Sequence, residues 1–234
     1  MTASLVRIVL LWGSALGSVF TPISGIAADR AFCSIYATHA MMSANRNVEY
    51  NCGFGGPSWS NGKALADNET GGHFKWCLNA SQEDAEGEEI GRLHTWDNCP
   101  QADRCRTYAK FAMRDIAVAR NNFPVFAPYF TGNRWGENEA GHENWCKTAP
   151  NEHVDSEHLA RMNELAKKAM CHNYAGLAHG SFVAMNNKRC GLSGPRWMNN
   201  DLAHFKWCMG VSYRTSEEEH RARVEELRNC RPKH

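Results

Sequence analysis

The chain has 234 residues, of which 43% are hydrophobic and 22% are charged, and this composition excludes a largely disordered or fibrous protein. Its 26 basic and 25 acidic residues nearly cancel, so no charge field favours nucleic acid or anionic lipid as a partner. The unusual residues are ten Cys and eight Trp, whose positions repeat along the chain.

The N-terminal segment, residues 1–27, has the layout of a secretory signal peptide. Arg7 precedes an apolar run from Ile8 to Phe20, and small residues follow, with cleavage expected after Ala27. The run of about 13 apolar residues is shorter than the ~20 that span a bilayer, so we expect no stable membrane insertion after cleavage. Export to the periplasm or out of the cell puts the cysteines in an oxidising compartment, where their even number predicts five disulfides.

Three related units follow, over residues 28–100, 101–169 and 170–234. Each contains a His-x-x-Trp-Cys segment, and in the first and third units this segment reads His-Phe-Lys-Trp-Cys. The first unit has cysteines at positions 33, 52, 77 and 99, and the third has them at 171, 190, 208 and 230, so that the first and last spacings agree. Self-similarity of this kind indicates a duplicated structural unit.

Each unit opens with the pattern Cys-x-x-Tyr-Ala-x-x-Ala, whose spacing places the four residues on one face of an α-helix. A glycine-rich turn follows and delivers a tryptophan, and the His-x-x-Trp-Cys segment then predicts a short helix. A charged helix closes the unit, and Ser81 and Ser212 are its expected N-caps in the first and third units. The sequence therefore predicts an all-α protein of three tandem helical repeats stapled by disulfides.

The middle unit lacks its second and fourth cysteines, and Pro128 and Lys168 stand in their places. Because a lone thiol is a liability outside the cytosol, the loss of these two together implies that they pair with each other. We therefore predict first-to-third and second-to-fourth bridges, namely Cys33–Cys77, Cys52–Cys99, Cys105–Cys146, Cys171–Cys208 and Cys190–Cys230. The stretch from Ser156 to Ala184 has no proline, so a helix is expected to run from the second unit into the third and to favour a stacked, rigid array.

Two tryptophans and a histidine recur in every unit and allow two interpretations. In the structural one, a Trp packs on each disulfide while the His donates to a backbone carbonyl. In the functional one, these aromatic faces and neighbouring arginines bind a sugar or a peptide. The candidate ligand-binding residues are Trp59, Trp135, Trp197, His73, His142, His204, Arg134 and Arg196. The second recurring tryptophan is Trp76 in the first unit, Trp145 in the second and Trp207 in the third.

Other chemistries find little support in the motifs. The pattern His-Glu-x-x-His is absent, the nearest pair (His153 and His158) has the wrong helical spacing, and oxidised cysteines cannot bind metal, so we expect no metal and no cofactor. Neither a Gly-x-Ser-x-Gly nor a phosphate-binding glycine loop is present. The acidic runs near Glu86 and Glu218 are typical of solvated helix starts. We therefore expect a protein that is not an enzyme.

The three patterns Cys-x-x-Tyr-Ala, Cys-Gly-x-x-Gly-Pro-x-Trp and His-x-x-Trp-Cys resemble repeats of small exported bacterial proteins of uncharacterised function, over nearly the whole mature chain. The resemblance implies no activity. The leading hypothesis is a non-enzymatic extracytoplasmic binding or scaffolding protein for a glycan, a peptide or an envelope protein. The alternatives are a small hydrolase or metal-dependent enzyme with its site at a groove between units, and an inhibitor that acts through the extra loop Gly62–Gly72.

Overall fold

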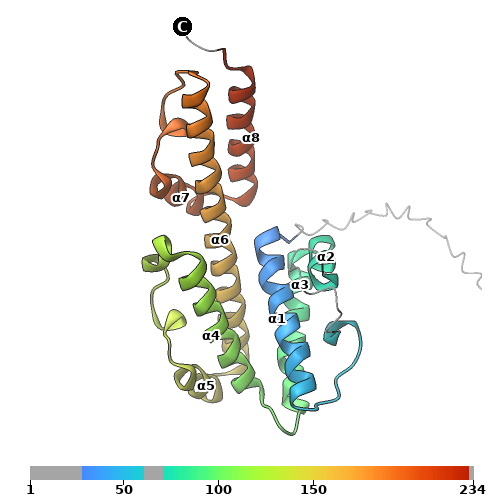
Figure 1. The fold of residues 1–234 in the computed structure, drawn as a ribbon. Helices are drawn as coiled ribbons and strands as arrows, with labels where there is room; N and C mark the ends of the chain where they lie inside the picture. Colours follow the sequence, from blue (N-terminus) through green and yellow to red (C-terminus); the bar gives the residue numbers. More distant parts are fainter. Residues whose placement is uncertain (1–27, 61–70, 232–234) are drawn as a thin grey trace, which may run out of the picture.

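The computed structural model describes residues 28–60 and 71–231 (Figure 1). The expected signal peptide and most of the extra loop of the first unit lie outside these residues. Every regular element described is helical, which confirms the all-α class. The α-helices are α1 (Arg30–Glu49), α2 (Gly72–Asn79), α3 (Gln82–Thr95), α4 (Arg104–Asn122), α5 (Glu139–Thr148), α6 (Asn151–Asn187), α7 (Asp201–Met209) and α8 (Tyr213–Asn229). Short 3₁₀ turns are η1 (Pro57–Trp59), η3 (Trp96–Asn98), η4 (Pro124–Tyr129), η5 (Asn133–Trp135) and η6 (Pro195–Trp197).

Each unit repeats one plan of a long helix, a tryptophan turn, a short helix and a closing helix. The first unit is α1, η1, α2 and α3, and the second is α4, η5, α5 and the first half of α6. The second half of α6 belongs to the third unit, together with η6, α7 and α8. The helix α6 is 37 residues long and continuous, as the absence of proline predicts. None of the helices in the described part of the chain is long and apolar enough to cross a bilayer.

Local sequence signals explain where these elements begin. Ser81 and Ser212 cap α3 and α8 as expected, each accepting a hydrogen bond from the backbone N–H three residues on. The tryptophan turns each start at a glycine with φ between 88° and 98°, a left-handed conformation that side chains disfavour. These glycines are Gly56, Gly132 and Gly194. The middle unit keeps the glycine although it lacks the following proline, so the glycine is the residue the turn requires.

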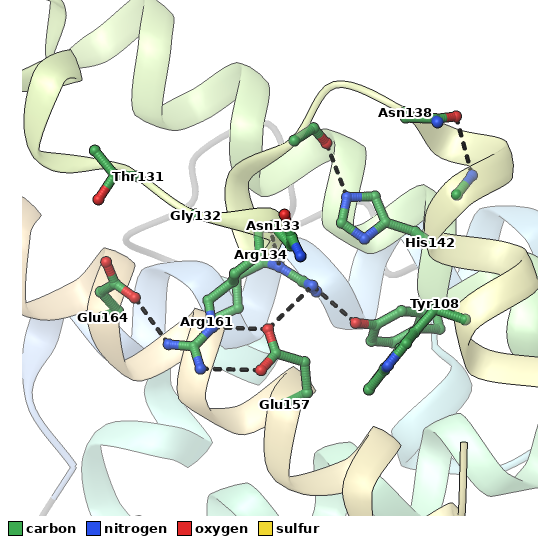
Figure 2. Close-up of a pocket in the computed structure, with 13 residues that line it drawn as sticks. Tyr108, Thr131, Gly132, Asn133, Arg134, Asn138, His142, Glu157, Arg161 and Glu164 are labelled. Carbon is green, nitrogen blue, oxygen red and sulfur yellow. Dashed lines mark hydrogen bonds and ion pairs between the residues drawn. The ribbon is translucent and has the colours of Figure 1, made fainter. Parts of the chain in front are cut away.

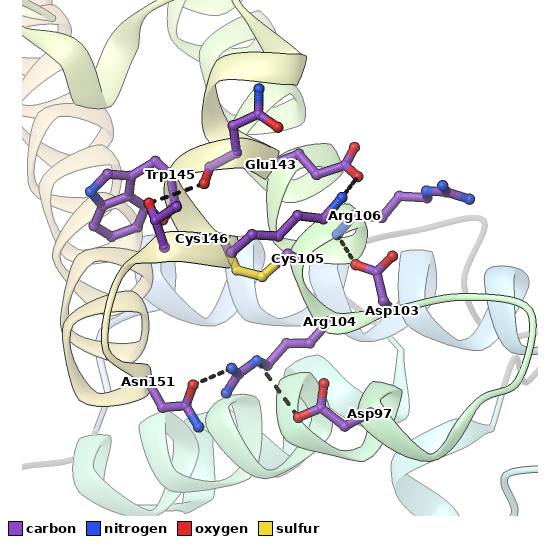
Figure 3. Close-up of a disulfide and its surroundings, with 12 residues drawn as sticks. Asp97, Asp103, Arg104, Cys105, Arg106, Glu143, Trp145, Cys146 and Asn151 are labelled. Atoms are coloured by element: carbon purple, nitrogen blue, oxygen red, sulfur yellow. Dashed lines mark hydrogen bonds and ion pairs between the residues drawn. A yellow bond between two sulfur atoms is a disulfide. The ribbon is translucent and has the colours of Figure 1, made fainter.

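The structure forms the five disulfides that the paired loss of cysteines predicts, and no free cysteine is found among the described residues. The three first-to-third bridges join the long helix of each unit to its short helix. Figure 3 shows the one in the second unit, Cys105–Cys146, between α4 and α5. Each bridge closes a loop of roughly 40 residues, and such a staple contributes about 3–4 kcal/mol in the unfolded-chain entropy treatment.

In the second unit a lysine takes the place of the missing staple. The ammonium group of Lys168 donates to the backbone carbonyl of Tyr129 and lies 2.5 Å from Oε1 of Glu164. It also lies 4.2 Å from the ring centre of Phe130 and 5.7 Å from that of Trp135. Because Pro128 and Lys168 stand where the other units have cysteines, these contacts join the same two segments without a covalent bond.

The first and second units pack together around an approximate twofold axis. In this pair α1 packs on α6 while α3 packs on α4. Equivalent contacts occur in both directions: Glu86 of the first unit bonds Asn163 of the second at 2.9 Å, and Asp155 of the second bonds His94 of the first at 2.9 Å. Glu86 and Asp155 are equivalent positions of the two closing helices, as are His94 and Asn163. The two units therefore form a four-helix bundle through matching faces.

Within residues 28–60 and 71–231 no unit packs against the third in this way, and the equivalent face of the third unit is more exposed. Leu93 and Met162, at one equivalent position, are fully buried, whereas Val224 in the third unit is 39% exposed. At a second equivalent position, Phe111 in the second unit is buried and Leu177 in the third unit is 50% exposed. The polar residue Arg221 stands where the first two units have Ile90 and Leu159. A polar outer face is typical of the terminal unit of a repeat array, because such a unit has solvent on one side.

Candidate functional site

Each unit is built around a buried arginine that bonds the tyrosine of the opening pattern. The guanidinium groups are at most 3% exposed and donate to the tyrosine hydroxyls at 3.0, 2.8 and 3.1 Å. Their Nε groups donate to the backbone carbonyl just before the turn tryptophan, at 3.3 Å in every unit. The pairs are Arg92 with Tyr36, Arg161 with Tyr108, and Arg223 with Tyr174. This arginine ties three elements of the unit together.

The tyrosine hydroxyls remain protonated at physiological pH. Burial raises the pKa of Tyr36 to about 12, although the Arg92 guanidinium acts in the opposite direction. Burial also raises the pKa values of Tyr108 and Tyr174. Each hydroxyl therefore accepts a hydrogen bond from arginine as a neutral phenol and is not poised to become a nucleophile.

The recurring histidines are placed as the structural interpretation predicts. Each is at most 8% exposed, and its Nε2 donates to a backbone carbonyl in or just after the tryptophan turn, at 2.9–3.2 Å. These are His73, His142 and His204. Burial lowers the pKa values of His73 and His142, which favours the neutral ring. The histidines fix the turn against the short helix and have little surface left for a ligand.

The turn tryptophans do not present ligand faces in the second and third units. Trp135 and Trp197 are 4% and 5% exposed, and their indole N–H groups donate to Glu164 and Glu226 at 3.1 and 3.0 Å. Trp59 is partly buried against the Cys52–Cys99 bridge. The interpretation of Trp135 and Trp197 as ligand contacts is therefore corrected: they are core residues, because the small units need large side chains to fill the space around the turn, whereas Trp59 is only partly buried.

The two candidate arginines form ion-pair clamps beside the turn tryptophans. Arg134 binds both carboxylate oxygens of Glu157, at 2.7 and 2.9 Å, and donates to Glu164 at 2.8 Å. Arg196 binds Glu219 and Glu226 in the same way. The hydrogen bonds with Glu157 raise the pKa of Arg134 above its ordinary value. Both arginines are about one-third exposed, so part of each guanidinium faces solvent.

The first unit lacks this clamp altogether. Ser58 stands at the position of Arg134, and Thr95 stands at that of Glu164. The arginine and the second glutamate are therefore absent together, which indicates that they act as a pair. Only the second and third units carry the clamp.

The second recurring tryptophan of each unit is the exposed one. The three side chains are 43%, 40% and 39% exposed, and each ring leans over the buried tyrosine with ring centres 5.2–5.6 Å apart. They are Trp76, Trp145 and Trp207. These three tryptophans are not among the ligand-binding residues expected from the sequence, because their recurrence alone does not show which of the two tryptophans of a unit faces solvent. The cysteine side chain points inward, and its neighbour on the short helix points outward.

In the second unit the buried tyrosine and arginine, the histidine, the ion-pair clamp and the exposed tryptophan line a recess. It has a volume of about 680 Å³ and is partly open to solvent. Figure 2 shows Arg134 and Arg161 facing Glu157, with Tyr108 and His142 to one side of them. Trp145 and the asparagines Asn133 and Asn138 also line the recess. The volume is within the range of about 300–1,000 Å³ that is typical of small-molecule sites.

The charged groups that line the recess are paired with one another. Burial would raise the pKa of Glu164, but hydrogen bonds from Lys168 and Arg134 outweigh this and lower it, so the carboxylate is ionised. Glu157 is held by Arg134, so neither carboxylate is available as a general acid. No thiol or activated hydroxyl lines the recess. The recess offers an aromatic face, amide groups and balanced charges.

Comparisons of the chain with models of protein families, with curated proteins and with solved structures find no match.

Proposed function

We propose that the protein is a non-enzymatic extracytoplasmic binding protein whose recess in the second unit holds a neutral glycan against Trp145. The observation that carries the proposal is the exposed tryptophan, repeated in all three units at about the same exposed fraction. A large indole face left in solvent beside a polar recess is typical of a ligand-binding surface. Five disulfides fit a protein that works in an oxidising compartment, in the periplasm or outside the cell.

The charges of the recess favour a neutral ligand. Two guanidinium groups, of Arg134 and Arg161, stand against two carboxylates, of Glu157 and Glu164. An anionic or a cationic ligand would have to displace one partner of an existing ion pair, which leaves a charge without compensation. A sugar places an apolar ring face on the indole and hydroxyl groups near the amides and the outer edges of the ion pairs. A peptide or an envelope protein is the second choice, since it also offers neutral polar groups.

The enzyme alternative required histidines and carboxylates from different units to converge in one cleft. A group of this kind exists among the described residues, formed by His39, Glu89, Asp115 and His158, but all four side chains are at most 2% exposed. A substrate could not reach them without opening the bundle. The inhibitor alternative depends on the loop Gly62–Gly72, most of which lies outside the described residues. Neither alternative gains support from the geometry.

The proposal is tested by titrating the exported, oxidised protein with a panel of neutral oligosaccharides and measuring heat by calorimetry. We expect at least one to bind, and Trp145→Ala to weaken it about tenfold, because loss of an aromatic contact and its buried area is worth roughly 1–2 kcal/mol. Trp207→Ala, the equivalent change in the third unit, is the matched control and should leave the recess of the second unit intact. Equal effects of the two variants, or no heat with any oligosaccharide in protein with five correct bridges, would overturn the proposal.

A further inference from the structure

A buried polar cluster lies where the first and second units meet, well away from the recess. It takes one side chain from each helix of the four-helix bundle: His39 from α1, Glu89 from α3, Asp115 from α4 and His158 from α6. These side chains are at most 2% exposed. Removing a polar group from water raises the free energy of the folded protein unless the buried group forms a strong hydrogen bond, ion pair or metal bond.

Three potential metal-ligand atoms converge in this cluster. Nδ1 of His39 lies 3.1 Å from Oε1 of Glu89, and Nε2 of His158 lies 2.9 Å from the same oxygen. All three atoms lie within 4.8 Å of one another. Two ligands bound at 2.0–2.1 Å to a tetrahedral zinc ion are about 3.3–3.4 Å apart, and the two distances to Oε1 of Glu89 are roughly 0.2–0.5 Å shorter than this spacing.

In two of these ligands, His39 and Glu89, the other nitrogen or oxygen atom already has a hydrogen-bond partner. Oδ1 of Asp115 lies 2.9 Å from Nε2 of His39, and the Arg92 guanidinium donates to Oε2 of Glu89 at 2.5 Å. Metal-binding histidines commonly donate their other ring N–H to a carboxylate, which fixes the ring and selects the nitrogen that binds. The arginine likewise leaves Oε1 of Glu89 as the oxygen that faces the two imidazoles.

The repeat itself does not require the residues at two of these positions, those of His39 and Asp115. The position of His39 is Phe111 in the second unit and Leu177 in the third, and the position of Asp115 is serine in both other units, at Ser43 and Ser181. An apolar residue is therefore accepted by the repeat where His39 stands. The polar set is gathered only at the contact of the first and second units, which argues for a role specific to that contact.

We propose that His39, Glu89 and His158 bind a divalent transition-metal ion, with zinc as the first candidate, that joins the two units. Imidazole and carboxylate ligands suit zinc, and the cysteines cannot compete because they are oxidised. The carboxylates of Glu89 and Asp115 offset the charge of the ion, while Glu88, 3.4 Å from Arg92, offsets the guanidinium. Since the cluster is closed to solvent, the ion enters as the bundle forms and its role is structural.

The competing occupant of the cluster is a proton. Burial alone would lower the pKa of His39, but the carboxylates of Asp115 and Glu89 outweigh it and raise the pKa to about 9. A doubly protonated His39 would donate to both carboxylates, and a neutral His158 would donate from Nε2. The two occupants make different predictions, because only one of them brings a metal with the purified protein.

The test measures how much metal the purified protein carries. The protein is exported without an affinity tag by cells grown in zinc-containing medium, and it is dialysed against a weak chelator before the measurement. We expect about one zinc ion per chain by mass spectrometry, with about two imidazole nitrogens in its first shell by X-ray absorption. His158→Gln should lose the ion, whereas His220→Gln, at the equivalent position of the third unit, should retain it. Oxidised, natively helical wild-type protein that carries no metal, including after refolding with excess zinc or cobalt, would overturn the proposal.

Folding of the variants is followed separately, because a change in a buried cluster can destabilise the bundle. If His158→Gln does not fold, Glu89→Gln is the second variant, since it keeps the shape of the side chain and removes the charge. The wild-type measurements decide the question even if both variants fail. Zinc retained equally by His158→Gln and His220→Gln would place the ion elsewhere and would also overturn the proposal.

Discussion

Arg161→Met is expected to lower the free energy of unfolding by about 3 kcal/mol, since each buried polar group left without a partner costs ~1–3 kcal/mol. The guanidinium is fully buried, and its removal strands the hydroxyl of Tyr108 and the carbonyl of Arg134. It also removes a cation–π contact, with the guanidinium carbon 5.0 Å from the ring centre of Tyr108. Methionine can fill much of the same space but can donate to neither oxygen.

Urea unfolding with far-UV circular dichroism measures this loss. Arg134→Met is the matched control, because Arg134 is one-third exposed and a pair of that kind is typically worth up to about 1 kcal/mol. Tyr108→Phe, alone and combined with Arg161→Met, completes a double-mutant cycle that isolates the interaction between the two side chains. If Arg161→Met and Arg134→Met cost the same, the buried pair is not the anchor of the unit that its contacts indicate.

The combined change Pro128→Cys and Lys168→Cys is expected to form a sixth disulfide and to raise the free energy of unfolding by about 1–3 kcal/mol. The two positions are 40 residues apart, as are Cys190 and Cys230 in the third unit. A loop of that length gives about 4 kcal/mol in the chain-entropy treatment, from which the lost contacts of Lys168, roughly 1–3 kcal/mol, are subtracted. The equivalent bridges have Cα–Cα distances of 5.1 and 5.6 Å, within the ordinary range.

Peptide mapping by mass spectrometry shows whether the new bridge forms, and urea unfolding measures its effect. The control is Pro128→Ser with Lys168→Ser, which loses the same lysine contacts but cannot form a bridge and should be less stable than the wild type. A new bridge with no gain over this control would mean that a staple at these positions does not stabilise the middle unit, and a control as stable as the wild type would mean that the lysine contacts do not replace one. Failure of the bridge to form would mean that the middle unit is not equivalent to its neighbours at these positions.

Class, units and cystine pairing could be predicted from the amino-acid sequence because each leaves a periodic or duplicated trace in it. The spacing of Cys33, Tyr36 and Ala40 places them on one face of a helix over two successive turns, which is local geometry. Cysteine is absent at both Pro128 and Lys168, which indicates that the cysteines at the equivalent positions of the other units form a disulfide with each other. The continuous α6 likewise follows from the lack of a helix breaker between Ser156 and Ala184.

The candidate site could be predicted only in part. The recurrence of tryptophan, histidine and arginine marked the right segments, and His142 and Arg134 do line the recess. The recurrence of two tryptophans in each unit does not show, however, which of the two faces solvent. Trp135 is buried and Trp145 is exposed because the closing helix covers the turn and leaves the outer side of the short helix free. That choice depends on how three helices pack.

The contact between the first and second units is the feature that no local pattern encodes. His39 and Glu89 are separated by 50 residues and Glu89 and His158 by 69, and no spacing rule connects them. They meet because two copies of one repeat face each other about an approximate twofold axis, while the third copy is left without a partner. The repeat and its covalent staples follow from the order of residues along the chain. The convergence of its buried charges follows from docking, where burial and desolvation act between segments far apart in that order.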